Sequence, residues 1–257
     1  MNPVLESLFQ HKSIRKYKNQ PIEDEKLNLI IKAAQAAPNW CNGQQVSIIV
    51  VKDPERKARL AKLNLNQPYV ASCSAFLVFC ADYYRASLAF EKVGDKDFAE
   101  KYISQLDIVM VGAHDVGIAL QNAVVAAESM GLGTVPIGTI RSQSLEVIKE
   151  LKLPKYVIPM IGLCVGYPDD EPGIKPRLPS QAMCFQEEYD TSKLSSDIDG
   201  YDEQFKKYVA ERGDNERDVT WSQRLYQLYS ASYNSGRYNN DYELLKQQGF
   251  IEVEKKK

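Results

Sequence analysis

The sequence predicts an α/β or α+β sandwich, in which helices cover a central sheet. Three runs of mainly apolar residues are typical of buried strands: Val46–Val51, Ala75–Ala81 and Pro159–Gly166. Segments with helical signals separate these runs, and strands that are separated by helices indicate a layered fold. With 257 residues, the chain is long enough for one large domain or two small ones.

Start and stop signals place the helices around these strands. Residues 3–10 are predicted to form a short helix, and the acids after Pro21 favour the first turn of a second helix, which ends before Pro38. Asp53 precedes Pro54, a pair that is typical of a helix N-terminus. The next helices are expected at residues 54–63, 85–108, 109–130 and 142–151.

The chain changes character beyond Lys193. Residues 194–257 are polar and rich in tyrosine, without an evident core of their own. Their three expected helices cover residues 199–211, 219–230 and 241–248. The predicted organisation is a core of residues 1–193 and a helical extension of residues 194–257, which packs on the core or on a second subunit. The small residues of the 109–130 helix also suit close helix packing, and both features favour a homodimer.

The overall composition argues against several classes of protein. A formal net charge of −2 disfavours nucleic acid as the main partner. No apolar run is expected to reach the roughly 20 residues that span a bilayer, and no secretory signal is evident. Five cysteines without a C-x-x-C motif and only two histidines fit a reduced, cytoplasmic protein without a protein-bound transition metal.

A basic stretch near the N-terminus is the first candidate binding element. The residues His11-Lys12-Ser13-Ile14-Arg15-Lys16-Tyr17 include four potential cations. In an extended segment, His11, Ser13 and Arg15 share one face and Ile14 takes the other. Donors on one face, anchored by an apolar residue, suit an anion such as a phosphate. The alternative is a solvated basic turn.

A second basic motif lies near position 175. In Gly173-Ile174-Lys175-Pro176-Arg177-Leu178-Pro179, two prolines restrict the backbone around Lys175 and Arg177. A rigid loop loses little entropy on ordering, so these spaced cations suit the second half of a phosphate clamp. The alternative is a polyproline-like surface linker.

The sequence shows no arrangement of nucleophile and base. His114 falls within the register of the 109–130 helix and is expected to be structural. No paired acids stand out, and the G-x-G-x-x-G motif of a Rossmann site is missing. Phosphate-type motifs without an acid–base set fit an enzyme whose cofactor performs the chemistry. We therefore assign no catalytic side chain.

Five motifs together resemble the FMN-dependent nitroreductase and flavin reductase family, in its NADPH-preferring bacterial branch. The stretch at 11–17 resembles the H-R-S-I-R-x-F opening of that branch, with Lys12 in place of arginine, and 175–179 resembles its K-P-R-L-P. Residues 126–133 resemble A-A-E-S-L-G-L-G, and 66–70 and 79–82 also fit. Each motif is weak alone, but five in the same order over nearly the whole chain are specific.

The resemblance implies an α+β fold: a three-layer α-β-α sandwich with a mostly antiparallel central sheet and a C-terminal helical extension. It also implies bound FMN, with NADPH as the reductant. Arg15 is expected near N1 and C2=O of the flavin, where a cation stabilises the negative charge of the reduced ring. The other residues that the resemblance implies are, around the phosphate, His11, Lys12, Ser13, Lys175 and Arg177, and, beside the pyrimidine edge, Gln67 and Tyr69.

Residues 135–141, Val-Pro-Ile-Gly-Thr-Ile-Arg, correspond to the Y-I-G-G-L-R segment whose backbone passes against the flavin in this family. An N–H near Gly138 is expected to bond the flavin N5, since glycine permits close backbone approach. Without the resemblance, this segment reads as an ordinary strand. The implied cofactor contacts are Pro136, Ile137, Gly138, Thr139 and Arg141, of which Pro136 and Thr139 depart from the family pattern.

A further loop aligns with one that reaches the flavin, often from the partner subunit. Its implied contacts are Asn39, Trp40, Asn42 and Gln44, where this branch usually has a Ser/Thr-rich loop. Trp40 is expected to form the floor or lid of the substrate pocket. Alternatively, it is a surface tryptophan at a dimer contact.

The segment from Glu211 to Ser222 resembles the R-G-S-N-N-R-R-D-T-W-S loop, whose arginines recognise the 2′-phosphate of NADPH in this branch. Arg212 and Arg217 match the pattern, Asp218 stands where a third arginine is common, and Arg237 corresponds to a further one. A preference for NADPH is expected, weaker than in the pattern.

The predicted function is a homodimeric FMN oxidoreductase that passes electrons from NAD(P)H to nitroaromatics, quinones or flavins by ping-pong hydride transfer. One alternative is a dedicated NADPH:FMN reductase that supplies free reduced flavin. Another is a non-catalytic flavin-binding regulator. The sequence does not separate these activities, because all three need the same cofactor site.

Overall fold

The computed structural model describes residues 2–95, 97–212 and 218–251. The chain divides into two compact units. Unit 1 comprises Met1–Glu171 and Tyr238–Lys257, and unit 2 comprises Pro172–Arg237. The C-terminal end of the chain therefore belongs to the same unit as its N-terminal end.

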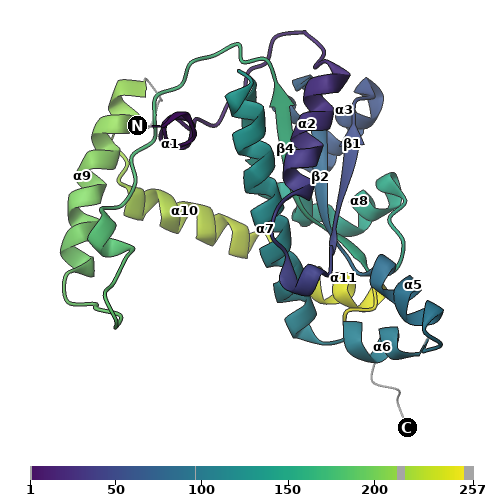
Figure 1. Cartoon of the computed structure of the whole chain (residues 1–257). Helices are drawn as coiled ribbons and strands as arrows, with labels where there is room; N and C mark the ends of the chain where they lie inside the picture. Colours follow the sequence, from purple (N-terminus) through teal and green to yellow (C-terminus); the bar gives the residue numbers. More distant parts are fainter. Residues whose placement is uncertain (1, 96, 213–217, 252–257) are drawn as a thin grey trace. The chain divides into compact units, whose positions relative to one another are not determined.

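Unit 1 contains one antiparallel sheet with the strand order β1-β2-β4-β3 (Figure 1). Three of its strands coincide with the predicted apolar runs. β2 is buried along its whole length, because it has a strand on each side and helices over each face. The strand bounds are β1 (Val46–Val51), β2 (Ala75–Asp82), β3 (Gly133–Ile137) and β4 (Val157–Gly166).

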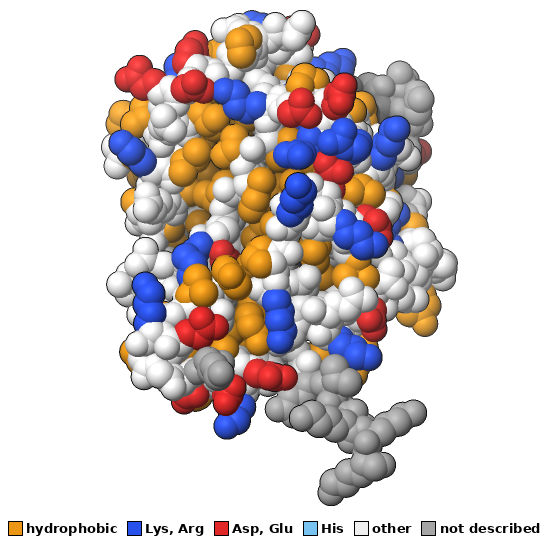
Figure 2. Space-filling model, turned by 90° about the vertical axis from the view of Figure 1, so that its right-hand side faces the viewer, with side chains coloured by type: hydrophobic (Ala, Val, Ile, Leu, Met, Phe, Trp, Pro, Cys, Tyr) orange, Lys and Arg blue, Asp and Glu red, His pale blue; other side chains and the backbone are white. Residues whose placement is uncertain are grey.

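β1 lies at an edge of the sheet, and its first five residues are only half-buried. The expectation of a fully buried strand is wrong here, since β1 has a strand neighbour on one side only. Figure 2 faces the side on which β1 is drawn in Figure 1, and shows hydrophobic side chains across that face with lysines and arginines among them. Charged side chains near an edge strand disfavour its pairing with a strand of another chain.

Local capping signals set several helix boundaries. Asn2 Oδ1 accepts a hydrogen bond from Leu5 N at 3.0 Å, and Asp53 Oδ1 accepts one from Arg56 N at 2.7 Å. The helices of unit 1 are α1 (Pro3–Phe9), α2 (Asp24–Gln35), η1 (Trp40–Asn42), α3 (Pro54–Leu63), α4 (Pro68–Ser72), α5 (Tyr84–Lys92), α6 (Phe98–Ile103), α7 (Leu106–Ser129), η2 (Gly138–Gln143), α8 (Ser144–Leu151) and α11 (Asp241–Gln247). Those of unit 2 are η3 (Ser180–Ala182), α9 (Leu194–Arg212) and α10 (Trp221–Asn234).

Helices cover both faces of the sheet because successive side chains of β2 point to opposite faces. Leu77 and Phe79 belong to a core cluster with residues of α2 and α7. Phe76 and Val78 belong to a second cluster with residues of α3 and α8. Two helical layers around one antiparallel sheet confirm the predicted three-layer sandwich.

α7, with 24 residues, is the longest helix of the described chain, and Figure 1 shows it running alongside α2. Its buried residues recur at helical spacing, among them Val116, Ala119, Ala123 and Ala127. By length and composition alone, α7 is apolar enough to cross a membrane. The expectation that no segment reaches this limit is therefore wrong. Within unit 1, α7 packs as the central helix of a core.

Unit 2 has a small core cluster of its own. Tyr201, Phe205 and Val209 recur every fourth residue on α9 and are buried, and Trp221 packs against them. The expectation that the C-terminal part lacks a core is wrong to this extent.

The chain re-enters unit 1 at Tyr238. Leu244 of α11 and Phe250 are buried in the same core cluster as α2 and α7, and Phe250 is completely inaccessible. The Tyr83 and Phe250 rings meet edge to face, with centroids 5.9 Å apart. This packing anchors the last described residues to the first unit.

Candidate functional site

The basic stretch at 11–17 runs beside β3. Ile14 N donates to Thr134 O at 2.9 Å, and Ser13 forms an isolated parallel bridge with the same residue. Ile14 is buried, Ser13 is half-buried and Arg15 is exposed. The alternation expected from the sequence is therefore present, with the polar side chains turned away from the core.

Gly133 permits this close approach. A Cβ on Gly133 would lie 2.6, 2.8 and 2.9 Å from three side-chain carbons of Ile14. Any larger residue would therefore push the basic stretch away from β3. Gly133 therefore lets the basic stretch pack closely against β3.

Arg15 and Tyr69 lie together. Arg15 Nη1 donates to Ser13 O at 3.4 Å, and the guanidinium lies near the Tyr69 side chain. Burial raises the pKa of Tyr69, and the positive charge of Arg15 opposes that shift. An exposed guanidinium held from two sides is well placed to bind an anion or a carbonyl oxygen.

His11 is oriented by Glu128, at the C-terminal end of α7. The His11 Nδ1 and the Glu128 Oε1 lie 2.8 Å apart, and the same oxygen accepts a hydrogen bond from Thr134 Oγ1 at 2.7 Å. A carboxylate oxygen accepts hydrogen bonds, so Nδ1 carries a proton. Nε2 is then the ring nitrogen that is left to meet a ligand.

Lys12 forms an ion pair with Glu171, whose side chain is largely exposed. An exposed ion pair contributes little free energy, typically about 0–1 kcal/mol. Lys12 can therefore exchange this partner for a ligand anion at small cost.

The turn before α4 carries Gln67. Leu65 and Asn66 have φ values of 59° and 56°, in the left-handed region. The fully buried Asn64 supports this turn, since its Nδ2 donates to Leu60 O at 2.8 Å. Gln67 Oε1 is buried and has no hydrogen-bond partner among the described residues. A buried acceptor without a donor costs about 1–3 kcal/mol, so this oxygen suits a ligand N–H.

Gly138 begins η2 directly after β3 and is exposed. A Cβ on Gly138 would meet no atom within 4 Å, so its backbone faces open space. Thr139 Oγ1 donates to Asn64 Oδ1 at 3.3 Å, which ties this segment to the turn that carries Gln67. An exposed backbone segment beside a buried orphan acceptor suits a flat ligand with polar edges. The preceding residues, Pro136 and Ile137, are the last two of β3.

Arg141 takes a different direction. Its guanidinium lies over the Tyr238 ring, 5.3 Å from the centroid, and its charge lowers the pKa of Asp241, which burial raises. Arg141 thus contacts the segment in which the chain re-enters unit 1.

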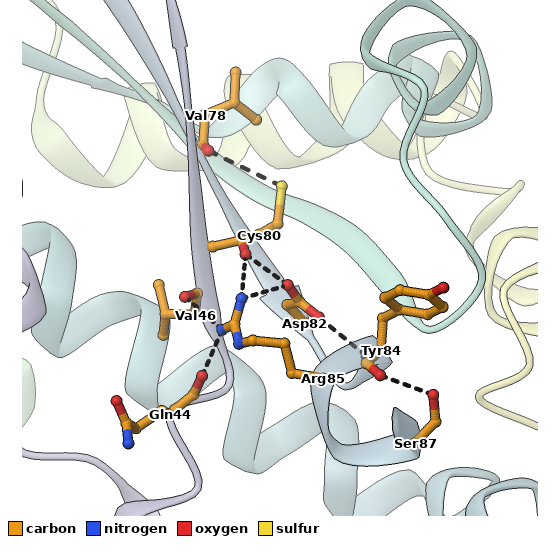
Figure 3. A network of polar contacts seen from close by, with 9 residues as sticks. Gln44, Val46, Val78, Cys80, Asp82, Tyr84, Arg85 and Ser87 are labelled. Atoms are coloured by element: carbon orange, nitrogen blue, oxygen red, sulfur yellow. Dashed lines mark hydrogen bonds and ion pairs between the residues drawn. The ribbon is translucent and has the colours of Figure 1, made fainter. Parts of the chain in front are cut away.

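Segment Asn39–Gln44 connects α2 to β1 and contains η1. Gln44 N donates to Asn39 Oδ1 at 3.0 Å, and Figure 3 shows Arg85 reaching the carbonyl of Gln44. Behind the segment lies a pocket of about 380 Å³, which Asn39 and Gln44 line. Trp40 and Asn42 are exposed. Among the described residues, no hydrogen bond joins this segment to the basic stretch or to Gln67.

The second basic motif lies in unit 2. Arg177 Nη1 donates to Lys175 O at 2.8 Å, and Tyr201 OH donates to Pro176 O at 2.8 Å. Arg177 also lines a pocket of about 470 Å³ against α9. The motif therefore has defined internal contacts within its own unit.

The arginines expected at the NADPH 2′-phosphate are placed only in part. Arg212 is the last residue of α9, and its side chain is not described. Arg217 lies outside the described residues. Arg237 is half-buried in the turn after α10.

Sequence reasoning missed the residues that orient this site. Glu128 belongs to the 126–133 motif, which gives no sign that this residue contacts His11, 117 residues away in sequence. Asp115 lies in the buried register of the apolar helix α7, and a lone acid at such a position was the available signal. Arg85 carried no signal, since one arginine in a polar helix is ordinary.

Comparisons with known proteins identify the family. Residues 8–167 match the family model of the nitroreductase family, and residues 175–252 match that of the nitroreductase family C-terminal domain. The chain belongs to the nitroreductase family. The predicted family is thus confirmed.

Individual nitroreductase relatives match over nearly the full chain. The protein named FMN reductase [NAD(P)H] of Bacillus subtilis is 45% identical over 256 residues, which cover 99% of this chain and 100% of that one. The oxygen-insensitive NADPH nitroreductase of Salmonella typhimurium is 38% identical over 227 residues, 88% of this chain and 90% of that one. The solved structure of the hypothetical oxidoreductase YcnD from Bacillus subtilis matches with a TM-score of 0.91 at 44% identity and covers 98% of this chain and 99% of that one.

Proposed function

We propose that this nitroreductase is an FMN-containing enzyme that uses NAD(P)H to reduce aromatic or flavin acceptors. The names of the relatives, FMN reductase and NADPH nitroreductase, agree with the predicted activity. The observation that carries the proposal is the buried Gln67 Oε1, which lacks a donor among the described residues and lies two residues before Tyr69, the neighbour of Arg15.

The donor set fits FMN residue by residue. Ser13 offers a donor to a phosphate, and His11 Nε2 offers a second donor when both ring nitrogens carry protons. Gln67 Oε1 offers an acceptor to an N–H of the pyrimidine edge, which relieves its unmet hydrogen bond. Gly138 offers an exposed backbone without a side chain in the way. We keep Lys175 and Arg177 as further phosphate ligands on the sequence pattern.

FMN, when bound, supplies the hydride chemistry, so the protein needs no nucleophile or acid–base pair of its own. Arg15 presents a fixed positive charge, held by Ser13 O and Tyr69, which favours negative charge on the ligand atom that it faces. The backbone N–H near Gly138 can hold a ligand ring nitrogen at a fixed place. Both contributions are electrostatic and are set before the ligand arrives.

The protein should purify yellow, with one FMN per chain, and NADPH should bleach its visible absorbance without oxygen. Arg15→Ala should weaken FMN binding by about tenfold to a hundredfold, since a charged hydrogen bond contributes about 1.5–3 kcal/mol. The Lys52→Ala control, which removes an exposed ion pair with Asp24, should retain flavin. A colourless protein that cannot be reconstituted with FMN contradicts the proposal.

The names of the relatives offer two kinds of acceptor, free flavin and nitroaromatic compounds. Relative turnover of free FMN and of nitrofurazone distinguishes a flavin reductase from a broad nitroreductase. NADPH is the proposed reductant, with a modest preference over NADH that rests on Arg212, Arg217 and Arg237. The cytoplasm is the proposed location, on the cysteine usage.

A homodimer is the proposed assembly. In support, α1 and α7 contact each other and carry exposed apolar side chains, among them Phe9 at 61% and Met110 at 55% exposure. Ile118, also exposed, extends this surface along α7. Ile118→Asp with Met110→Asp should yield monomers in analytical ultracentrifugation, whereas Leu88→Asp on α5 should not. A monomeric wild-type protein at micromolar concentration contradicts this assembly.

A further inference from the structure

Segment Asn39–Gln44 has a backbone that its own residues do not favour. Cys41, Asn42 and Gln44 have φ values of 47°, 55° and 49°, in the left-handed region. None is glycine, and this conformation is sterically unfavourable for L-amino acids, less so for Asn. The strained conformation therefore needs support from contacts outside the segment.

The first support comes from Asp115 on α7. Trp40 N donates to both oxygens of the Asp115 carboxylate, at 3.1 and 3.2 Å. Asp115 is 3% exposed, within the apolar register of the helix. A buried carboxylate is costly unless it is hydrogen-bonded, so its presence here is explained by the backbone that it holds.

The second support comes from Arg85 on α5 (Figure 3). Its Nη2 donates to Gln44 O at 2.5 Å and to Val46 O at 2.9 Å, and its Nη1 donates to Asp82 Oδ2 at 2.8 Å and to Ser47 Oγ at 2.7 Å. The buried Asp82 thus orients a guanidinium that holds the far end of the segment.

Packing does not replace these hydrogen bonds. The pocket of about 380 Å³ borders the segment at Asn39 and Gln44 and is also lined by Arg85 and Asp115. A segment above a cavity can move inward when its hydrogen bonds are lost, because no side chains fill the space. Trp40, whose backbone N–H the first support holds, has a side chain that is 47% exposed.

We propose that Asp115 and Arg85 are positioning residues that hold Trp40 in place as a wall for bulky aromatic acceptors. The kinetic consequence rests on the proposed function and on the expectation that Trp40 forms the floor or lid of the substrate pocket, whereas the restraint on Trp40 stands on the hydrogen bonds alone. The KM for a small acceptor that does not contact Trp40 should stay unchanged when either support is removed.

Trp40 itself reports on the restraint. The chain has two tryptophans, so Trp221→Phe leaves Trp40 as the sole emitter. In that background, Asp115→Ala should raise the acrylamide quenching constant of Trp40 about twofold and lower its fluorescence anisotropy. Asp115→Asn, which keeps an acceptor for Trp40 N–H, should restore both values. Asp107→Ala, at an exposed position of the same helix, is the matched control.

Kinetics supply the second readout. Asp115→Ala should raise the KM for a bulky nitroaromatic or quinone about tenfold, with little change in kcat or in turnover of ferricyanide. If Asp115→Ala fails to fold, Arg85→Lys is the second variant, because lysine cannot reach Gln44 O, Val46 O and Asp82 together. It should change the Trp40 quenching constant and the KM in the same direction as Asp115→Ala. Unchanged Trp40 quenching in both variants overturns the restraint. Changed quenching with an unchanged KM ratio overturns the role in acceptor choice. A wild-type protein that binds no FMN and oxidises no NADPH contradicts the proposed function. The quenching of Trp40 still tests the restraint in that protein.

Discussion

His11 and Glu128 are joined by a 2.8 Å contact between Nδ1 and Oε1, although 117 residues separate them in sequence. Thr134 donates to the same oxygen at 2.7 Å. This contact selects which nitrogen of the imidazole faces outward. If His11 binds the phosphate of FMN through Nε2, Glu128 contributes to cofactor affinity without touching the cofactor.

We expect Glu128→Ala to weaken FMN binding by about tenfold, the equivalent of about 1.4 kcal/mol, because the imidazole loses its fixed orientation. Glu128→Gln keeps an acceptor oxygen and should retain most of the affinity. Titration of FMN-free protein by flavin fluorescence quenching measures both. Glu146→Ala, which breaks only an exposed ion pair with Lys149, is the control. Equal affinity in Glu128→Ala and wild type would exclude this role.

Gly133→Ala should destabilise the protein by about 1–3 kcal/mol, as overpacked core substitutions do. The added Cβ meets Ile14 at 2.6–2.9 Å, and Ile14 anchors the basic stretch. Urea unfolding measures the stability, and the visible spectrum reports the flavin content, which should fall too. Gly117→Ala, where a Cβ meets no atom within 4 Å, should be neutral or stabilising in a helix. A stable, flavin-replete Gly133→Ala variant would show that the stretch can move without consequence.

Gln67→Leu should have opposite effects on the two forms of the protein. Without FMN, the substitution removes a buried acceptor that has no donor, so the unfolding free energy should rise by about 1 kcal/mol. With FMN, the lost hydrogen bond should lower the affinity by about threefold to tenfold. Thermal unfolding of both forms tests this pattern. Destabilisation of the FMN-free form would mean that Gln67 Oε1 is satisfied within the protein.

The stability of the protein should depend on pH through Asp115. Desolvation raises the pKa of Asp115 above its ordinary value of 3.8, while the Trp40 N–H and His114 partly oppose the shift. A carboxyl group with a raised pKa in the folded state favours folding while it is protonated. That contribution is lost as the pH rises from 3.8 through the folded pKa.

Asp115→Asn does not titrate at this position. Its stability relative to wild type should therefore improve as the pH rises through that window and then stay constant. Urea unfolding at several values between about pH 4 and 7 measures the difference, with Asp107→Asn as the control on the same helix. A difference that does not change with pH would contradict the raised pKa.

Arg212→Ala should raise the KM for NADPH far more than the KM for NADH, with unchanged flavin content. The wild-type preference for NADPH should be about tenfold to a hundredfold in kcat/KM, because charged contacts to a phosphate contribute about 1.5–3 kcal/mol and neighbouring acids reduce that. Added salt should shrink the preference, since exposed charges are screened. Equal losses for both nucleotides would show that Arg212 does not read the 2′-phosphate.

The sequence by itself determined the layered fold, because strand and helix signals are local. The runs at 46–51, 75–81 and 159–166 became three of the four strands, since β-branched and apolar residues favour burial in a sheet whatever their partners are. The alternation around Ile14 was equally local. The family followed from motifs in their order along the chain.

Only the tertiary structure decided which distant residues meet. Glu128 reaches His11, and Asp115 reaches Trp40, because α7 passes both segments on its way across the sheet. The return of Phe250 into the core of unit 1 had no signal in the polar sequence around it. The local sequence predicts that a residue is buried, but not which surface it is buried against. That choice depends on the free energy of packing the whole chain.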